Sequence, residues 1–235
     1  MLYFYKRENI KDKSKYNDIV KRDLSDDDYF SVIVKGVARN SRKSYNFDRK
    51  PCFFNTEKSD EEKRLCRCLV CYNEESKSAQ CDECALKNEE FYAKPVKNAT
   101  FIDFEVPVSN KRNDQIGRID LLMTDKNNND LYCVEFKPYW NDESLLRMVA
   151  EIITYTYVLD NDRTNFEKKY NPEKKYKPYK KAIMFMENSE QWKQWTDKNY
   201  RHFACDRLRE IIKKEDITVF CLKLDNDEYI VEKLN

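Results

Sequence analysis

Two short apolar runs, GRIDLLM at residues 117–123 and LYCVEFK at residues 131–137, flank a polar break, TDKNNND, at residues 124–130. The break is rich in Asn and Asp, which predicts the turn of a hairpin between two strands. Because side chains alternate between the faces of a strand, Glu135 and Lys137 are expected to point the same way. The sequence therefore predicts two adjacent strands that carry charges in their interior.

The charged positions of this hairpin form a candidate site. If the two strands pair, Asp120 can lie beside Glu135 and Lys137, while the opposite face packs into a core through Tyr132, Val134 and Phe136. Charges on an apolar sheet are costly unless they are paired or bound to a metal ion. The same Glu-x-Lys spacing occurs at residues 61–63, 167–169 and 173–175, but there it stands in polar surroundings typical of solvated surface.

The composition of the 235-residue chain excludes several classes of function. The net charge is +1, so the chain has no global basic field of the kind many DNA-binding domains carry. Two glycines exclude Gly-rich phosphate loops, and a single histidine, His202, excludes chemistry built on several histidines. No apolar run approaches the roughly 20 residues of a membrane helix, and the apolar start is too short for a signal peptide. We expect no membrane association and an intracellular location, either cytoplasmic or nuclear.

Cysteines are concentrated between residues 52 and 84. The pairs Cys68-x2-Cys71 and Cys81-x2-Cys84, nine residues apart, have the spacing with which two loops supply four thiolates to a tetrahedral Zn²⁺. Cys66 or Cys52 could replace one of these ligands. Buried thiols and an iron–sulfur cluster are the alternatives, whereas an intracellular location disfavours disulfides. The remaining cysteines lie in apolar runs typical of a core: Cys133, Cys205 and Cys221.

Hydrophobic periodicity predicts the elements around the hairpin. Helices are expected at residues 82–94, 143–159 and 189–214, with Asn141 or Asp142 as the N-cap of the second. Strands are expected at residues 29–37, 100–108 and 182–186, followed by a hairpin at 217–222 and 228–231; residues 160–181 read as a mobile loop. In strand 100–108, one face is expected to carry Phe101, Asp103 and Glu105, and the other Ile102, Phe104 and Val106.

This order of elements predicts an α/β fold, or an α+β sandwich, in which helices flank a mixed sheet. Three parts are expected along the chain: an N-terminal segment at residues 1–51 with no assigned role, a Cys-rich zinc-binding module at 52–85, and the main domain at 86–235. The zinc module is expected to serve as a scaffold or lid, because metal binding supplies folding energy that its small core cannot.

The hairpin resembles the PD-(D/E)XK nuclease superfamily, which has the restriction-endonuclease-like fold. Asp120, after Gly117-Arg118-Ile119, corresponds to the "PD" half of the motif, and Glu135-Phe136-Lys137 to the second half. The segment from Glu151 to Tyr155 is similar to the Gln-x3-Tyr motif of the RecB-like branch. The chain departs from the pattern at Ile119, where Pro is usual, and at Glu151, where Gln is usual. The resemblance covers roughly residues 82–186.

The resemblance implies roles for these residues. Asp120 and Glu135, aided by the Phe136 carbonyl, would bind one or two Mg²⁺ or Mn²⁺ ions, which prefer oxygen ligands. Lys137 would position or deprotonate the attacking water, or stabilise the developing charge. Glu105 resembles the additional acidic residue of many members, with Glu89 and Glu90 as rivals. Glu151 and Tyr155 would orient the site or the substrate.

The function expected from sequence is a metal-dependent endo- or exonuclease that hydrolyses phosphodiester bonds, with DNA as the substrate and zinc as a structural ion. The alternative is a non-catalytic nucleic-acid- or protein-binding module on a degenerate nuclease fold, in which Asp120, Glu135 and Lys137 form only a buried ion pair. The Lys- and Tyr-rich loop at 168–181 and the helix carrying Trp192 and Trp195 could contact nucleic acid, or could be a solvated linker and core. The sequence does not indicate whether the chain forms an oligomer.

Overall fold

The structure is a computed structural model that describes residues 61–73, 78–79, 94–108, 118–141, 143–160, 163–173, 178–197 and 202–235. Several predictions fall outside these ranges: the segment 1–51 with its strand at 29–37, the helix at 82–94 with Glu89 and Glu90, and the thiols of Cys52, Cys71, Cys81, Cys84 and Cys205. The structure does not test these predictions, and they stay predictions.

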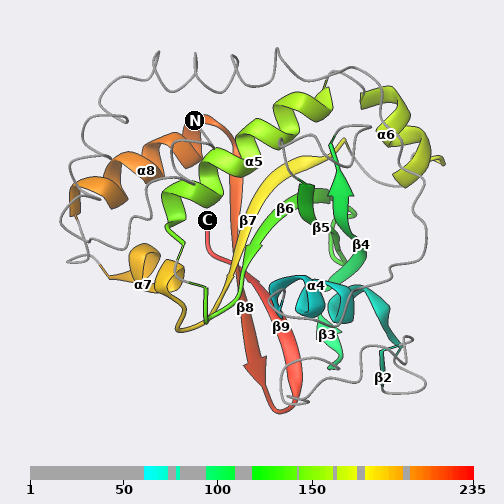
Figure 1. The fold of residues 1–235 in the computed structure, drawn as a ribbon, viewed down its shortest axis with the longest axis horizontal. Coiled ribbons are helices and arrows are strands. Elements are labelled where there is room, and N and C mark those ends of the chain that lie inside the picture. Colours follow the sequence, from blue (N-terminus) through cyan, green and yellow to red (C-terminus); the bar gives the residue numbers. More distant parts are fainter. Residues whose placement is uncertain are drawn as a thin grey trace.

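Within the described ranges, seven strands form one mixed sheet in the order β3-β9-β8-β7-β6-β5-β4 (Figure 1). The central strands β6, β7 and β8 are parallel to one another, as are β3 and β9, and the other neighbours are antiparallel. The strands are β3 Val96–Lys97, β4 Ala99–Pro107, β5 Arg118–Asp125, β6 Leu131–Lys137, β7 Lys180–Met186, β8 Ile217–Asp225 and β9 Glu228–Lys233. Strands β3 and β4 stand at opposite edges of the sheet, yet only Asn98 separates them in the chain. The sheet must therefore curl so that its two edges approach each other.

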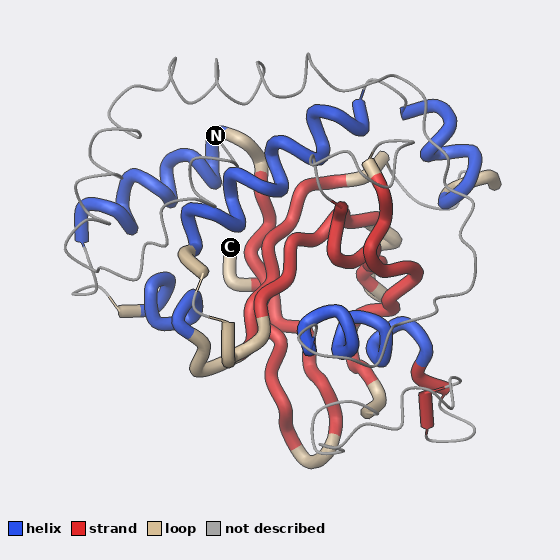
Figure 2. Tube along the Cα trace, viewed as in Figure 1, coloured by secondary structure: helices blue, strands red, loops and turns tan. Residues whose placement is uncertain are grey.

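Helices cover both faces of this sheet (Figures 1 and 2). They are α4 Glu61–Cys71, α5 Leu145–Leu159, α6 Arg163–Tyr170, α7 Glu190–Thr196 and α8 His202–Lys214. One core cluster joins one sheet face to α5, α6 and α8 through residues such as Ile152, Phe166 and Ile211. The second cluster joins the other face to α4 through Leu65, Cys66, Cys68 and Leu69. The predicted mixed α/β architecture with flanking helices is confirmed.

The predicted central hairpin is confirmed. Strands β5 and β6 are antiparallel, with Thr124 opposite Leu131, and residues 126–128 form the turn. All seven side chains of β6 are buried. Those predicted to face a core, Tyr132, Val134 and Phe136, lie in the second cluster. Glu135 and Lys137 therefore lie on the opposite face, toward α5.

The alternation predicted for strand β4 is wrong. Phe101 and Phe104 share the second core cluster, whereas Val106 belongs to the first and Ile102 packs against it. Two backbone irregularities account for this: the pairing with β5 shifts register between Phe101 and Asp103, and Glu105 has φ 51°. An extra residue or a positive φ reverses the face on which later side chains emerge. A strict period of two cannot anticipate either.

Three helical predictions also differ from the structure. The predicted helix 189–214 is divided, because Asp197 has an extended backbone that ends α7. The N-cap of α5 is Ser144, whose Oγ accepts the Arg147 N–H at 3.3 Å, and not Asn141 or Asp142. The expected loop at 160–181 contains helix α6. The C-terminal hairpin is confirmed as β8 and β9, but it belongs to the main sheet.

Helix α4 and a small two-stranded sheet occupy the described part of the Cys-rich segment. Cys66 and Cys68 lie on helix α4. Each is only 1% exposed, because this helix packs against the main sheet through the second core cluster. Strands β1 Tyr72–Asn73 and β2 Ser78–Ala79 pair antiparallel between the two Cys-x2-Cys pairs in the sequence. In the ranges that the structure describes, no helix is both long and apolar enough to span a bilayer.

Candidate active site

The candidate site lies where strands β5 and β6 separate. Their regular pairing ends at Leu121 opposite Val134, and beyond this point a side chain takes the place of a backbone acceptor. The Phe136 N–H donates to Asp120 Oδ2 at 2.8 Å. This hydrogen bond fixes Asp120 beside Glu135 and Lys137, as the sequence predicted. A carboxylate that accepts a backbone N–H is oriented without a separate side-chain donor.

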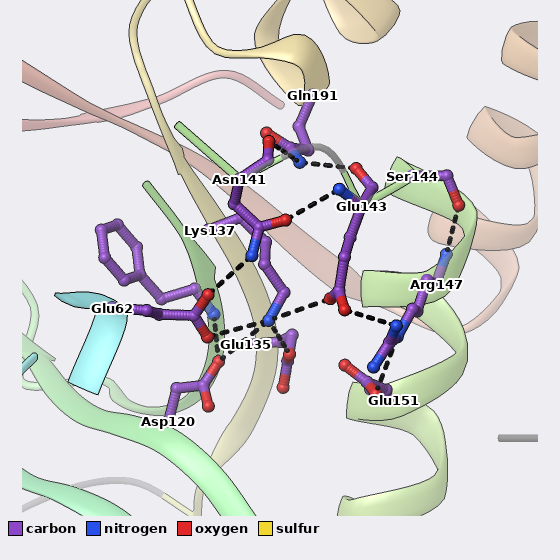
Figure 3. Close-up of polar contacts among 11 residues, drawn as sticks. Glu62, Asp120, Glu135, Lys137, Asn141, Glu143, Ser144, Arg147, Glu151 and Gln191 are labelled. Atoms are coloured by element: carbon purple, nitrogen blue, oxygen red, sulfur yellow. Dashed lines mark hydrogen bonds and ion pairs between the residues drawn. The ribbon is translucent and has the colours of Figure 1, made fainter. Parts of the chain in front are cut away.

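Lys137 is the centre of the site (Figure 3). Its Nζ lies 2.9 Å from Glu135 Oε1, 3.0 Å from Glu62 Oε1, 3.4 Å from Glu143 Oε2 and 3.9 Å from Asp120 Oδ2. The Lys137 side chain is only 6% exposed. Its four carboxylate partners come from α4, β5, β6 and the segment before α5. One buried ammonium thus connects elements from distant parts of the chain.

Helix α5 contributes a second cation to the site. Arg147 pairs with Glu143 and, through Nε at 3.2 Å, with Glu151 Oε1. The Glu151 carboxyl group lies close enough to that of Glu135 for the two to interact electrostatically. One turn further along the helix, Tyr155 is 4% exposed. We call the seven charged residues the Lys137 cluster: Glu62, Asp120, Glu135, Lys137, Glu143, Arg147 and Glu151.

Burial controls the protonation of the two motif carboxylates. It raises the pKa of Asp120, and the negative charges of Glu62 and Glu105 act in the same direction, against the attraction of Lys137. Burial likewise raises the pKa of Glu135, and Asp120 reinforces the effect. Both groups are thus more costly to ionise than a carboxylate in water.

The surrounding groups respond in a complementary way. Burial alone would lower the pKa of Lys137, but the attraction of Glu135, Asp120 and Glu62 outweighs it and raises the pKa. Burial opposes ionisation of Glu151, yet the charge of Lys137, the interaction with the Glu135 carboxyl group and Arg147 together lower its pKa. Burial and the nearby carboxylates raise the pKa of Tyr155, so its phenol stays neutral.

Glu105 lies close to this cluster but has a partner of its own. It stands across from Asp120 in the β4–β5 pairing, between Phe104 opposite Leu121 and Val106 opposite Ile119. Its side chain is 11% exposed, and its Oε2 is 2.9 Å from Arg118 Nη1. The left-handed backbone of Glu105, φ 51°, is costly for a residue with a side chain. Its predicted role as an additional metal ligand stays a prediction.

The structure brings together Asp120, Glu135, Lys137, Glu151 and Tyr155, and it adds Glu62, Asn141, Glu143 and Arg147, none of which the sequence analysis proposed as a site residue. Glu62 belongs to one of the Glu-x-Lys stretches that the sequence analysis expects to be solvated. Asn141 and Glu143 follow the motif directly, and their proximity in sequence was the available signal. No periodic pattern in the chain pointed to Glu62, because its contact with Lys137 spans 75 residues.

The donor set fits a divalent cation by charge. Among the described side chains, the Lys137 cluster gathers five carboxylates against two cations. Glu135 Oε2 is buried and has no hydrogen-bond partner. A hard cation would satisfy both the excess charge and this oxygen, and Mg²⁺ typically binds through only one or two carboxylates. In the described ranges, however, no group of three or more His, Cys, Asp or Glu side chains is arranged so that it could hold a metal ion.

Helix α4 places a thiol beside the site. Cys66 follows Glu62 by one helical turn and packs in the second core cluster. Burial raises the pKa of the Cys66 thiol, and the charges of Asp120 and Glu62 raise it further. A thiol with a raised pKa is a poor nucleophile, so Cys66 is not a candidate nucleophile of this site.

What the fold and the site define is a mixed α/β protein with a buried cluster of carboxylates around one lysine. No protein-family profile matches the chain, and no curated protein matches it. Among solved structures, the chain is similar to SfsA from Pyrococcus furiosus in complex with Ca²⁺, with 12% identity and a TM-score of 0.26. That match covers 58% of this chain and 53% of the archaeal protein, so the chain matches about half the length of its neighbour. A similarity this distant carries no argument about activity.

Proposed function

We propose that this chain is a divalent-cation-dependent nuclease of the PD-(D/E)XK type that hydrolyses phosphodiester bonds, with DNA as its substrate. The observation that carries the proposal is the excess of carboxylates around the buried Lys137, at the point where β5 and β6 separate; Asp120, Glu135 and Glu151 are buried, and Glu62 and Glu143 are partly exposed. Five carboxylates for two cations leave an excess of negative charge that protonation of the buried carboxylates or a bound metal ion would balance, and the proposal assigns that part to a metal ion.

The residues have distinct parts in this proposal. Asp120 and Glu135 would hold Mg²⁺ or Mn²⁺ together with the Phe136 carbonyl, and a bound ion of this kind lowers the pKa of water and offsets charge on a phosphate. Lys137 supplies a fixed positive charge that orients the attacking water and stabilises the developing negative charge. Glu151, held by Arg147, orients Glu135, and the neutral Tyr155 phenol can donate a hydrogen bond toward the same carboxylates.

The test compares two buried aspartates. Purified protein is incubated with Mn²⁺ and single- or double-stranded DNA or RNA. We expect cleavage by the wild type, and a loss of about 1,000-fold or more in Asp120→Asn. The matched control is Asp130→Asn, which lies at the other end of β6 and binds Lys180 at 2.8 Å and Tyr132 at 3.3 Å, outside the site. If no substrate is cut, or if cleavage by Asp120→Asn equals that of the wild type, the nuclease proposal fails.

We propose further that Cys68, Cys71, Cys81 and Cys84 hold a structural Zn²⁺, with Cys66 as a possible substitute ligand. Two observations support this second proposal. Cys68 and Cys71 occupy positions i and i+3 at the end of α4, and positions with this spacing are adjacent on a helix. The antiparallel β1–β2 pair turns the chain back on itself between the two Cys pairs.

Elemental analysis tests the zinc site. We expect about one zinc ion per chain, lost in Cys81→Ser and retained in Cys133→Ser, whose thiol is buried in the first core cluster. We also expect a chelator to lower the thermal midpoint of the wild type, because metal binding contributes folding free energy. A protein free of zinc, or one holding iron with a visible absorption band, would overturn the assignment.

A further inference from the structure

The connection between β6 and α5 holds part of the Lys137 cluster in place. The Asn141 N–H donates to the Pro138 carbonyl at 3.1 Å and closes a β-turn. The Asn141 side chain donates to Glu62 Oε2 at 2.8 Å and accepts the Glu143 N–H at 2.8 Å. Two of the four carboxylates around Lys137 therefore depend on the position of this turn.

A fully buried glutamine of α7 forms hydrogen bonds with the backbone of this turn (Figure 3). Gln191 is 0% exposed, and its Nε2 donates to the carbonyls of Asn141 at 3.1 Å and Glu143 at 2.5 Å. Both of its amide hydrogens are used, while its Oε1 is buried without a hydrogen-bond partner. The opposite amide orientation would place Oε1 against two carbonyl oxygens, so the observed orientation is fixed by the turn. A buried acceptor without a partner costs free energy, so the unpartnered Gln191 Oε1 offsets part of the stabilisation from the two hydrogen bonds that Nε2 donates.

The same helix carries a second buried amide, which binds the start of α5. Gln194 is 3% exposed, and its Oε1 accepts the Leu145 N–H at 2.9 Å, one of the free N–H groups at the start of α5. Helix α7 itself is fixed by Ser189, which is 0% exposed and whose Oγ accepts the Trp192 N–H at 3.0 Å. Gln191 and Gln194 thus match in residue type, helix and burial, and differ in what they bind.

We propose that Gln191 is a positioning residue of the candidate active site. By holding the backbone at Asn141 and Glu143, it keeps Glu62 and Glu143 against Lys137. The expected effect of Gln191 on kcat rests on the proposed nuclease function. Its expected coupling to the Asn141 turn does not. Because Gln191 contacts no group predicted to touch substrate, its loss changes the geometry of the reacting groups and not the binding of substrate.

The first part of the experiment measures steady-state cleavage by Gln191→Met and Gln194→Met. Methionine preserves side-chain length and removes the hydrogen bonds. We expect Gln191→Met to lower kcat about 10- to 100-fold with KM changed less than about twofold. Gln194→Met is expected to lose similar stability and to keep the wild-type kcat. The shorter amide of Gln191→Asn cannot reach the turn and should reproduce the kcat loss. Equal kcat values for the Gln191 and Gln194 variants would overturn the inference.

The second part needs no activity and so separates this inference from the proposed function. The urea midpoints of the wild type, Gln191→Met, Asn141→Ala and the double variant form a double-mutant cycle. We expect Gln191→Met to shift the midpoint less in the Asn141→Ala background than in the wild type, because both residues act on one turn. Additive shifts would refute the coupling. If the wild type cuts no substrate, the nuclease proposal fails and this cycle alone decides the role of Gln191.

Discussion

Replacing Glu135 with Gln is expected to raise the free energy of unfolding of the metal-free protein by about 1–3 kcal/mol at neutral pH. Glu135 is 1% exposed, and one of its oxygens has no hydrogen-bond partner. The amide keeps an oxygen for Lys137 and presents N–H donors to Glu151, while one charge is removed from a cluster with an excess of carboxylates. A substitution in the site should therefore stabilise the fold.

The difference in the free energy of unfolding between Glu135→Gln and the wild type should depend on pH, because Glu135 is buried. Burial raises the folded-state pKa of Glu135 above its unfolded value, so the stability it contributes is fully present below the unfolded pKa and is lost as pH rises. Wild type and Glu135→Gln should thus be almost equally stable near pH 4, close to the unfolded pKa of about 4.3. The difference should grow toward pH 7. Urea unfolding in EDTA at several pH values measures it.

Divalent cations should reverse the order of stability. Mn²⁺ is expected to raise the midpoint of the wild type by binding the native state, and to have little effect on Glu135→Gln. Glu215→Gln is the control, since it removes the same charge from a half-exposed pair with Lys181 at 2.9 Å and should change little in either condition. A variant that is less stable than the wild type in EDTA and equally responsive to Mn²⁺ would contradict the assignment of the cluster as a cation site.

The second large effect is expected from Lys137→Met, which should lower the free energy of unfolding by about 3 kcal/mol or more. The substitution keeps the length of the side chain but leaves Glu62, Asp120, Glu135 and Glu143 without their shared cation. Removal of one partner from a buried ion cluster costs far more than loss of an exposed pair. Cleavage should also fall by about 100-fold or more, because Lys137 supplies the fixed positive charge of the site.

Two comparisons make this prediction specific. Lys181→Met removes a lysine from the neighbouring strand β7, where its partner is half exposed, and should cost less than about 1 kcal/mol. Mn²⁺ should restore more stability to Lys137→Met than to the wild type, since a metal ion can replace the missing charge. Equal losses in Lys137→Met and Lys181→Met would show that the cluster does not depend on its central cation.

The centre of the fold could be predicted from sequence because its signals are local. The Asn- and Asp-rich break at residues 124–130 identified the β5–β6 turn, and the alternation in β6 placed Glu135 and Lys137 on one face. The broad apolar stripe of α5 similarly identified a helix packed on a sheet. Each of these features depends on neighbours a few residues away, where periodicity is informative.

The remaining features depend on contacts that no local pattern encodes. Glu62 reaches the site because α4 packs on the sheet next to β4. In the chain, Glu62 and Lys137 are separated by 75 residues. The reversal of faces along β4 arises from the register shift after Phe101 and the positive φ at Glu105, which the hydrophobic pattern does not reveal. Gln191 reads as an ordinary polar residue of a helix, and only its burial against the Asn141 turn gives it a role.

The proposed function requires that the Lys137 cluster hydrolyse phosphodiester bonds with a divalent cation. The most direct measurement is the rate of cleavage of end-labelled DNA by wild type and Glu135→Gln, with Mn²⁺ and with EDTA, at a temperature where both proteins are folded. We predict Mn²⁺-dependent cleavage by the wild type and a rate at least about 1,000-fold lower for the variant, although its metal-free fold is the more stable of the two. Equal Mn²⁺-dependent rates, or no cleavage by the wild type, would contradict the proposed nuclease function.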